Sequence, residues 1–135
     1  MNLDKIVAVS GGLNGIYKMA ANRSNGLIVE DLDTGKRKFA SVRRHQFTPL
    51  NSVGIYTDDG DTAEISEVFQ RMLDQLEDNP PIPVKSSKDE LSAYFTKVLP
   101  NHDEERVYPR DIRRVIKWFN YLNERDYFNA VAEEE

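Results

Sequence analysis

The spacing of the apolar residues changes near residue 61 of the chain. Between Asp61 and Asp78 the apolar residues recur at the i, i+3, i+4, i+7 spacing that places them on one face of a helix. We therefore predict a helix here, begun by a capping box of Asp61 with Glu64 and ended at Asn79, before Pro80. Its predicted core face consists of Ile65, Val68, Phe69, Met72, Leu73 and Leu76.

Before this helix, short apolar runs alternate with turn-forming residues. The runs predict strands near residues 5–9, 15–20, 27–31, 36–40 and 53–56. Tight turns are predicted at Asn25-Gly26 and at Asp33-Thr34-Gly35, which would make two successive hairpins. Five short strands in about 55 residues are too few for a wide sandwich, so we expect a small SH3-like or Tudor-like antiparallel β-barrel that closes its own edges.

Two more helices are predicted after a proline-containing linker, residues 79–87. The first begins at a Ser87 and Glu90 capping box and ends at Pro100, and the second begins at Pro109. The chain is thus expected to be α+β, with a β-barrel domain over residues 1–60 and a three-helix bundle over residues 61–135. Residues 127–131 give only weak support for a fourth helix. The core faces of the two helices are Leu91, Tyr94, Phe95, Val98 and Leu99, and Ile112, Val115, Ile116, Phe119 and Leu122.

The composition is that of a soluble globular protein. Of the 135 residues, 39% are hydrophobic and 30% are charged, and no apolar run approaches the roughly 18 residues of a membrane span. The first residues lack the apolar core of a secretory signal, and the chain has no cysteine. These features predict a cytoplasmic protein without disulfides, thiolate metal sites or a cysteine nucleophile.

The net charge of −5 is distributed unevenly along the chain. Residues 1–60 carry 8 Lys and Arg against 6 Asp and Glu, whereas residues 61–135 carry 10 against 17. Part of the second figure lies in residues 133–135, which we expect to be a solvated acidic tail. An acidic chain argues against nucleic-acid binding that depends only on phosphate neutralisation, although local basic patches can override this.

Two basic clusters interleaved with aromatic residues are the candidate binding sites. Their composition suits phosphate contacts and base stacking. The alternative is that the aromatic residues of the second cluster cover a seam with the β half, while the basic side chains form a solvated face paired to nearby acids. The first cluster is Lys36, Arg37, Lys38, Arg43, Arg44 and His45 around Phe39, and the second is Arg110, Arg114, Lys117, Trp118, Tyr121 and Arg125.

No other motif predicts a catalytic, cofactor or metal site. Gly12-Leu13-Asn14-Gly15 matches a G-x-x-G loop, but its flanks read as strands, so a glycine-rich turn is favoured. The acidic loop that starts at Asn101 lacks the glycine and the bidentate glutamate of a calcium-binding loop. His45 and His102 have no partners at metal-ligand spacing and are expected to be surface side chains.

We therefore expect a non-enzymatic binding or adaptor protein that acts through contacts with a protein partner. The alternative is a nucleic-acid-binding protein that uses the basic clusters at residues 36–45 and 110–125. A homo-oligomer is also compatible with the sequence, and no cofactor is expected.

Segments in both halves resemble an uncharacterised bacterial family represented among structural-genomics targets. This resemblance covers nearly the whole chain. It implies an SH3-type barrel followed by an orthogonal helical bundle, and it implies no activity or site. The segments are Ser10-Gly11, Gly15-Ile16-Tyr17-Lys18, Gly26-Leu27-Ile28-Val29-Glu30 and Ile55-Tyr56 in the β half, with Val98-Leu99-Pro100, Arg106-Val107-Tyr108, Asp111 and Trp118-Phe119-Asn120 in the helical half.

Overall fold

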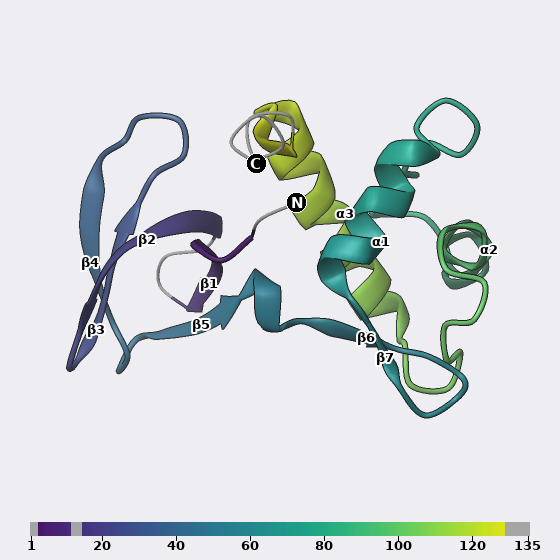
Figure 1. The fold of residues 1–135 in the computed structure, drawn as a ribbon, viewed down its shortest axis with the longest axis horizontal. Helices are drawn as coiled ribbons and strands as arrows, with labels where there is room; N and C mark the ends of the chain where they lie inside the picture. The colour runs from purple at the N-terminus through teal and green to yellow at the C-terminus, as the bar shows by residue number, and fades with distance from the viewer. Residues whose placement is uncertain (1–2, 12–14, 129–135) are drawn as a thin grey trace. The chain divides into compact units, whose positions relative to one another are not determined.

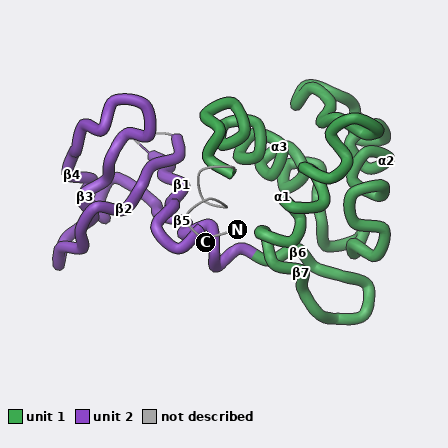
Figure 2. The backbone as a smooth tube through the Cα atoms, turned by 45° about the horizontal axis from the view of Figure 1, so that its top comes forward, with its two compact units in different colours: residues 1, 54–135 green, residues 2–53 purple. Residues whose placement is uncertain are grey.

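The computed structural model describes residues 3–11 and 15–128. The chain divides into two units, residues 2–53 and residues 54–135 together with residue 1 (Figure 2). We call them the β unit and the helical unit. The predicted division after residue 60 differs from this boundary, because the strand near residue 55 belongs with the helices. The G-x-x-G residues 12–14 and the acidic tail lie outside the described residues.

The β unit contains an antiparallel sheet of five strands in the order β4-β3-β2-β1-β5 (Figure 1). A short 3₁₀ helix, η1 (Leu50–Ser52), follows the last strand. The pairing leaves β4 and β5 at the two ends of the sheet, so hydrogen bonding among the described residues does not close it. The strands are β1 (Ile6–Gly11), β2 (Gly15–Arg23), β3 (Gly26–Glu30), β4 (Arg37–Ser41) and β5 (His45–Pro49).

The strand predicted near residues 53–56 is present, but its predicted place in this sheet was wrong. The fifth strand is β5, which pairs with β1 and lies in a segment where no strand was predicted, since Thr48 and Pro49 are typical of turns. In β5, half-buried His45, Phe47 and Pro49 alternate with exposed residues, which is the period of a strand packed on one face. Proline is tolerated there because it occupies the last position of an end strand. The residues near 55 form β6 (Gly54–Tyr56), which pairs with β7 (Thr62–Glu64) in a separate hairpin of the helical unit.

The core of the β unit is small and largely aliphatic. Its fully buried cluster is packed against partly buried side chains that include Tyr17 and Phe47. The register of β2 against β3 shifts between Met19 and Ala21, a β-bulge that bends the strand. A domain of this size buries a limited share of its surface, so its stability margin is expected to be narrow. The buried cluster is Val7, Val9, Val29 and Ala40.

In the described part of the helical unit, β7 is followed by α1 (Ile65–Asp74), α2 (Lys88–Val98) and α3 (Pro109–Glu124) (Figure 1). The α+β class, with one five-stranded sheet and three helices, is therefore confirmed. The core is aromatic: the Phe69 ring centroid lies 6.2 Å from that of Phe119 and 5.5 Å from that of Phe128. No helix in the described part of the chain is both long and apolar enough to cross a membrane.

The predicted start and end of the first helix were wrong. For the next two helices, the predicted start signals are confirmed: the Ser87 and Glu90 capping box for α2 and Pro109 for α3. Residues 62–64 form β7, so α1 begins at Ile65, and it ends at Asp74. The Asp61 carboxylate accepts a hydrogen bond from the Thr62 N–H at 2.8 Å and does not cap the helix. In α2, the Ser87 hydroxyl accepts from the Glu90 N–H and the Glu90 carboxylate accepts from the Ser87 N–H, as in a capping box.

The predicted core faces are largely confirmed. Four residues of the first helix are buried, whereas Leu73, within α1, and Leu76, beyond its end, are half-buried. In the segment expected to give weak support for a fourth helix, the described part ends at Phe128, which is buried and lies 5.4 Å from Phe119 between ring centroids. The buried residues of α1 are Ile65, Val68, Phe69 and Met72.

Candidate functional site

The first predicted cluster lies on β4 and its two flanking turns. Because β4 is an end strand, this surface occupies one edge of the β unit, and we call it the basic edge. Its members are all exposed, whereas His45, which the predicted cluster also contained, is half-buried at the start of β5. The basic edge comprises Lys36, Arg37, Lys38, Phe39, Arg43 and Arg44.

The turn before β4 holds Lys36 in a defined position. The Asp31 carboxylate accepts hydrogen bonds from the N–H groups of Asp33 at 2.8 Å and Thr34 at 3.0 Å. Gly35 has a φ of +73°, which favours glycine, and the Asp31 N–H donates to the Lys36 carbonyl at 2.9 Å. This turn is therefore closed by its own hydrogen bonds.

The turn after β4 positions Arg43 and Arg44. The Ser41 hydroxyl accepts from the Arg43 N–H at 3.1 Å, and the Ser41 carbonyl accepts from the Arg44 N–H at 3.2 Å and from the His45 ring at 3.0 Å. Gly11 of β1 has a φ of +113°, and a Cβ there would lie 2.2 Å from the Arg44 carbonyl oxygen. Only glycine allows this close approach. The turn borders a hollow of about 360 Å³.

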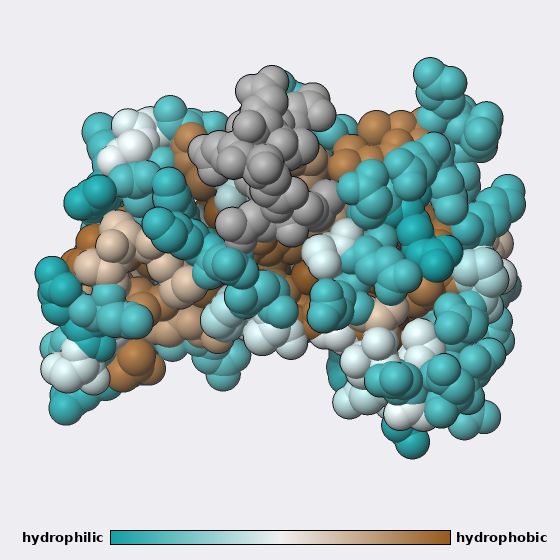
Figure 3. All heavy atoms as spheres, viewed as in Figure 1, coloured by the Kyte–Doolittle hydropathy of each residue, from teal (hydrophilic) through white to brown (hydrophobic). Residues whose placement is uncertain are grey.

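Most of the positive charge at the basic edge is uncompensated. The Arg37 guanidinium lies 3.1 Å from the Glu30 carboxylate, across the β3–β4 pair. Within the described residues the other four cations, Lys36, Lys38, Arg43 and Arg44, form no ion pair. Two apolar side chains are exposed beside them, Phe39 at 48% and Val42 at 56%. Figure 3 shows hydrophobic residues reaching the surface over the strands of the β unit, with hydrophilic residues around them.

The second predicted cluster does not form one aromatic and basic surface. Trp118 is only 9% exposed, whereas Arg110, Arg114 and Lys117 are exposed. Tyr121 is half-buried, and its ring centroid lies 3.5 Å from the Arg125 guanidinium carbon. A buried tryptophan offers no stacking face to a base, so the cluster retains its charge but loses the aromatic half of the predicted site.

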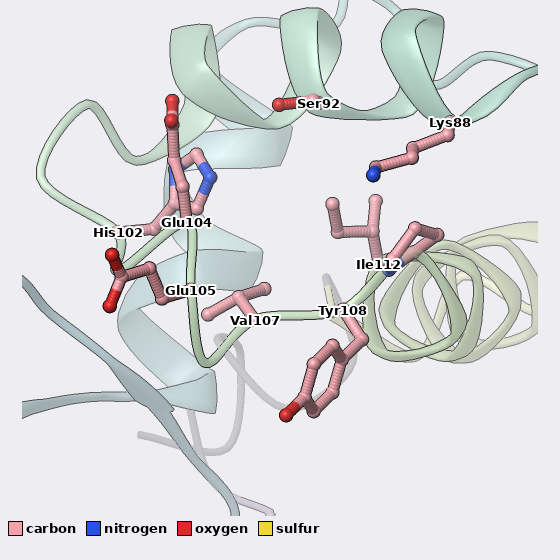
Figure 4. Close-up of a pocket in the computed structure, with 9 residues that line it drawn as sticks. Lys88, Ser92, His102, Glu104, Glu105, Val107, Tyr108 and Ile112 are labelled. Carbon is pink, nitrogen blue, oxygen red and sulfur yellow. The ribbon is translucent and has the colours of Figure 1, made fainter.

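A pocket of about 270 Å³ lies in the helical unit, where the start of α2, the loop after α2 and the start of α3 meet (Figure 4). The Lys88 ammonium and a ring nitrogen of His102 point into it from opposite sides, above the apolar side chains of Val107 and Ile112 (Figure 4). The remaining lining residues are Ser92, Glu104, Glu105, Tyr108 and Pro109.

The prediction that His102 is a surface residue was wrong. It is 5% exposed, its Nδ1–H donates to the Leu99 carbonyl at 2.9 Å, and its ring stands edge-on to Phe95 with centroids 5.1 Å apart. Its backbone forms a β-bridge with Thr57. The side chain is therefore held by Leu99 and Phe95 of its own segment, while its backbone pairs with Thr57, 45 positions earlier in the sequence.

The pocket contains one imidazole and no assembled metal centre. Among the described residues, no group of three or more His, Asp or Glu side chains could hold a metal ion. In the β6–β7 turn, hydrogen bonds from the Thr57 hydroxyl and the Asp61 N–H lower the pKa of Asp59. These hydrogen bonds occupy one oxygen of the Asp59 carboxylate with groups of the protein itself.

Since neither the pocket nor the β6–β7 turn brings together a metal-binding group among the described residues, the basic edge is the better candidate site.

Both parts of the chain match known families. Residues 53–122 match the family described as "Domain of unknown function (DUF6852)", and residues 3–50 match "Domain of unknown function (DUF5606)". The first match spans more than half of the chain, so the protein belongs to the DUF6852 family, and residues 3–50 are similar to the DUF5606 family. The boundary between the two matches agrees with the division of the structure at residue 53.

The chain is also similar to a solved bacterial structure. This is a solution NMR structure from Bacteroides vulgatus, determined by the Northeast Structural Genomics Consortium, with a TM-score of 0.69 and 34% sequence identity. The similarity covers 90% of this chain and 85% of the other chain. No curated protein matches the sequence. The predicted membership of an uncharacterised bacterial family is therefore confirmed.

Proposed function

We propose that the protein is a non-enzymatic binding module that engages an acidic segment of a protein partner through its basic edge. The observation that carries this proposal is the exposure of Phe39 and Val42 among four uncompensated cations. Aromatic and arginine side chains provide much of the binding energy at protein interfaces, and complementary charge selects the partner. We further propose that the module acts in the cytoplasm as an adaptor.

We also propose a more detailed architecture for each of the two units. We infer that the β unit is SH3-like, because its last strand returns to pair with its first and β2 is bent by a bulge. For the helices we propose the orthogonal three-helix bundle that the family resemblance implies. An experimental structure of this chain tests both, through the β4–β5 separation and the interhelical angles.

A protein partner is favoured over nucleic acid by the arrangement of the aromatic residues. Single-stranded nucleic acid is held by aromatic side chains on which successive bases stack beside a basic groove. The basic edge has one exposed aromatic residue, Phe39, and the buried Trp118 removes the second predicted stacking surface.

A pull-down with a matched variant tests the proposal. Wild-type protein and the Arg43→Ala/Arg44→Ala variant are immobilised and exposed to lysate of the bacterium that encodes the protein, with and without nuclease treatment. We expect the wild type to retain a protein partner that the variant loses, since both arginines are exposed and their removal leaves the core untouched. Loss of all retained protein on nuclease treatment would instead support nucleic-acid binding.

A further inference from the structure

We infer that the basic edge binds its acidic partner by strand addition, in which an extended segment of the partner pairs with β4. This inference rests on the proposed function and specifies its binding mode. An end strand leaves one row of backbone N–H and C=O groups without a sheet partner, and proteins use such rows to bind extended peptides.

The hydrogen bonds at the two ends of the β3–β4 pair show which backbone groups face outward. The Val42 N–H donates to the Asn25 carbonyl at 3.0 Å, and the Asp31 N–H donates to the Lys36 carbonyl at 2.9 Å. In an antiparallel pair, every second residue exchanges hydrogen bonds with its partner strand. The even-numbered residues of β4, Lys38 and Ala40, therefore bond to β3.

The odd-numbered residues of β4 then direct their backbone groups away from β3. These are Arg37, Phe39 and Ser41. The Ser41 carbonyl is already used by the following turn. Among the described residues, no other backbone group bonds to the remaining N–H and C=O groups of this row. The open row is therefore the N–H and C=O of Arg37 and Phe39, with the N–H of Ser41.

The side chains around this row select an acidic strand over other occupants. A second copy of β4 would bring two basic strands together, and like charges directly opposite each other are destabilising. The other end strand, β5, carries no lysine or arginine and ends at Pro49. An acidic strand places its carboxylates near Lys36, Lys38 and Arg43 and an apolar side chain beside Phe39.

Amide hydrogen exchange on the ¹⁵N-labelled full chain tests this inference directly. The probe is an acetylated peptide in which glutamate alternates with valine. When the peptide saturates the site, we expect the N–H groups of Arg37 and Phe39 to exchange at least about tenfold more slowly, because they gain hydrogen bonds. The N–H groups of Lys38 and Ala40 should change little, since they already bond to β3. Protection without this alternation, or protection in β5, would overturn strand addition.

A proline variant provides an independent test. Phe39→Pro removes an outward N–H without removing a bond to β3, and proline is tolerated on an end strand. Phe39→Ala is the matched control, because it removes the ring but keeps the N–H. We expect Phe39→Pro to bind the peptide about 3- to 10-fold more weakly than Phe39→Ala, which corresponds to the absence of roughly one hydrogen bond.

The outcomes separate the binding mode from the proposed function. If the peptide binds and Arg43→Ala/Arg44→Ala weakens it, but Phe39→Pro and Phe39→Ala bind equally, then side chains alone hold the peptide and strand addition is wrong. If the peptide does not bind at a concentration of about 1 mM while an oligonucleotide does, both the binding mode and the proposed function are wrong.

Discussion

The two units differ in how they use charge and aromatic residues. Residues 2–53 carry 8 Lys and Arg against 4 Asp and Glu, a net charge of +4, whereas residues 54–135 carry 10 against 19, a net charge of −9. The helical unit buries Phe69, Phe95 and Phe119 completely. The β unit has a small aliphatic core and leaves Phe39 and Val42 exposed.

This difference assigns separate roles to the two units. An aromatic side chain contributes most to stability when it is buried, and contributes to recognition when it is left at the surface beside charge. We therefore expect the helical unit to provide most of the stability and the β unit to provide the binding surface.

The largest expected effect is the loss of the aromatic core in the helical unit. Phe69→Ala should destabilise the unit by about 3–5 kcal/mol, because Phe69 is fully buried against Phe119 and Phe128. Chemical denaturation followed by the fluorescence of Trp118, the single tryptophan, measures this. The control Phe39→Ala in the β unit should change stability by less than about 1 kcal/mol. A loss below about 1 kcal/mol for Phe69→Ala would place Phe69 outside the core.

The next effect concerns a buried hydroxyl in α2. Tyr94 is 3% exposed, its hydroxyl has no hydrogen-bond partner among the described residues, and burial raises its pKa to about 12. The unfolded chain releases this proton near pH 10, so the folded state binds more protons between pH 10 and 12 and stability falls as the pH rises. The fall attributable to Tyr94 should total roughly 2–3 kcal/mol.

Comparison with Tyr94→Phe isolates this contribution, because the other tyrosines and the lysines titrate in both proteins. The variant should lack the extra fall in stability between pH 10 and 12. At pH 7 it should be as stable as the wild type or more stable, since it no longer buries an unpartnered hydroxyl. Identical pH profiles for the two proteins would show that the hydroxyl has a partner.

The smallest expected effect is that of metal ions on the acidic unit. Calcium and zinc should leave the melting temperature unchanged, because the described acidic residues form no metal-binding cluster despite the charge of this unit. Differential scanning calorimetry with each ion and with a chelator measures this. A stabilisation that titrates with either ion and disappears on chelation would contradict our interpretation of the acidic loop.

Signals that involve residues close together in the sequence correctly predicted where two of the helices begin. The Ser87 capping box and Pro109 began the second and third helices as expected, because capping depends on residues a few positions apart. The strand β5 was missed because Pro49 resembles a turn signal, and its pairing with β1 joins residues about 40 positions apart. The bridge between His102 and Thr57 likewise joins residues far apart in the sequence, and it was not predicted.

The candidate site was predictable in its residues but not in its geometry. The cluster from Lys36 to Arg44 is visible in the sequence as basic residues around Phe39. That β4 ends the sheet follows only from the strand order, which places β5 beside β1 and leaves β4 paired to β3 alone. The burial of Trp118 likewise depends on packing that helical spacing does not determine.

Direct titration with nucleic acid tests the central claim, that the basic edge recognises protein. Fluorescence anisotropy of labelled single-stranded and duplex DNA and RNA should give dissociation constants weaker than about 10⁻⁵ M near physiological salt, no tighter than ordinary nonspecific binding. Submicromolar binding would contradict the account if Arg43→Ala/Arg44→Ala abolished it while circular dichroism showed an intact fold. If the variant instead weakened the binding without abolishing it, the salt dependence of its binding should be shallower by roughly one unit of slope for each phosphate that the variant no longer neutralises.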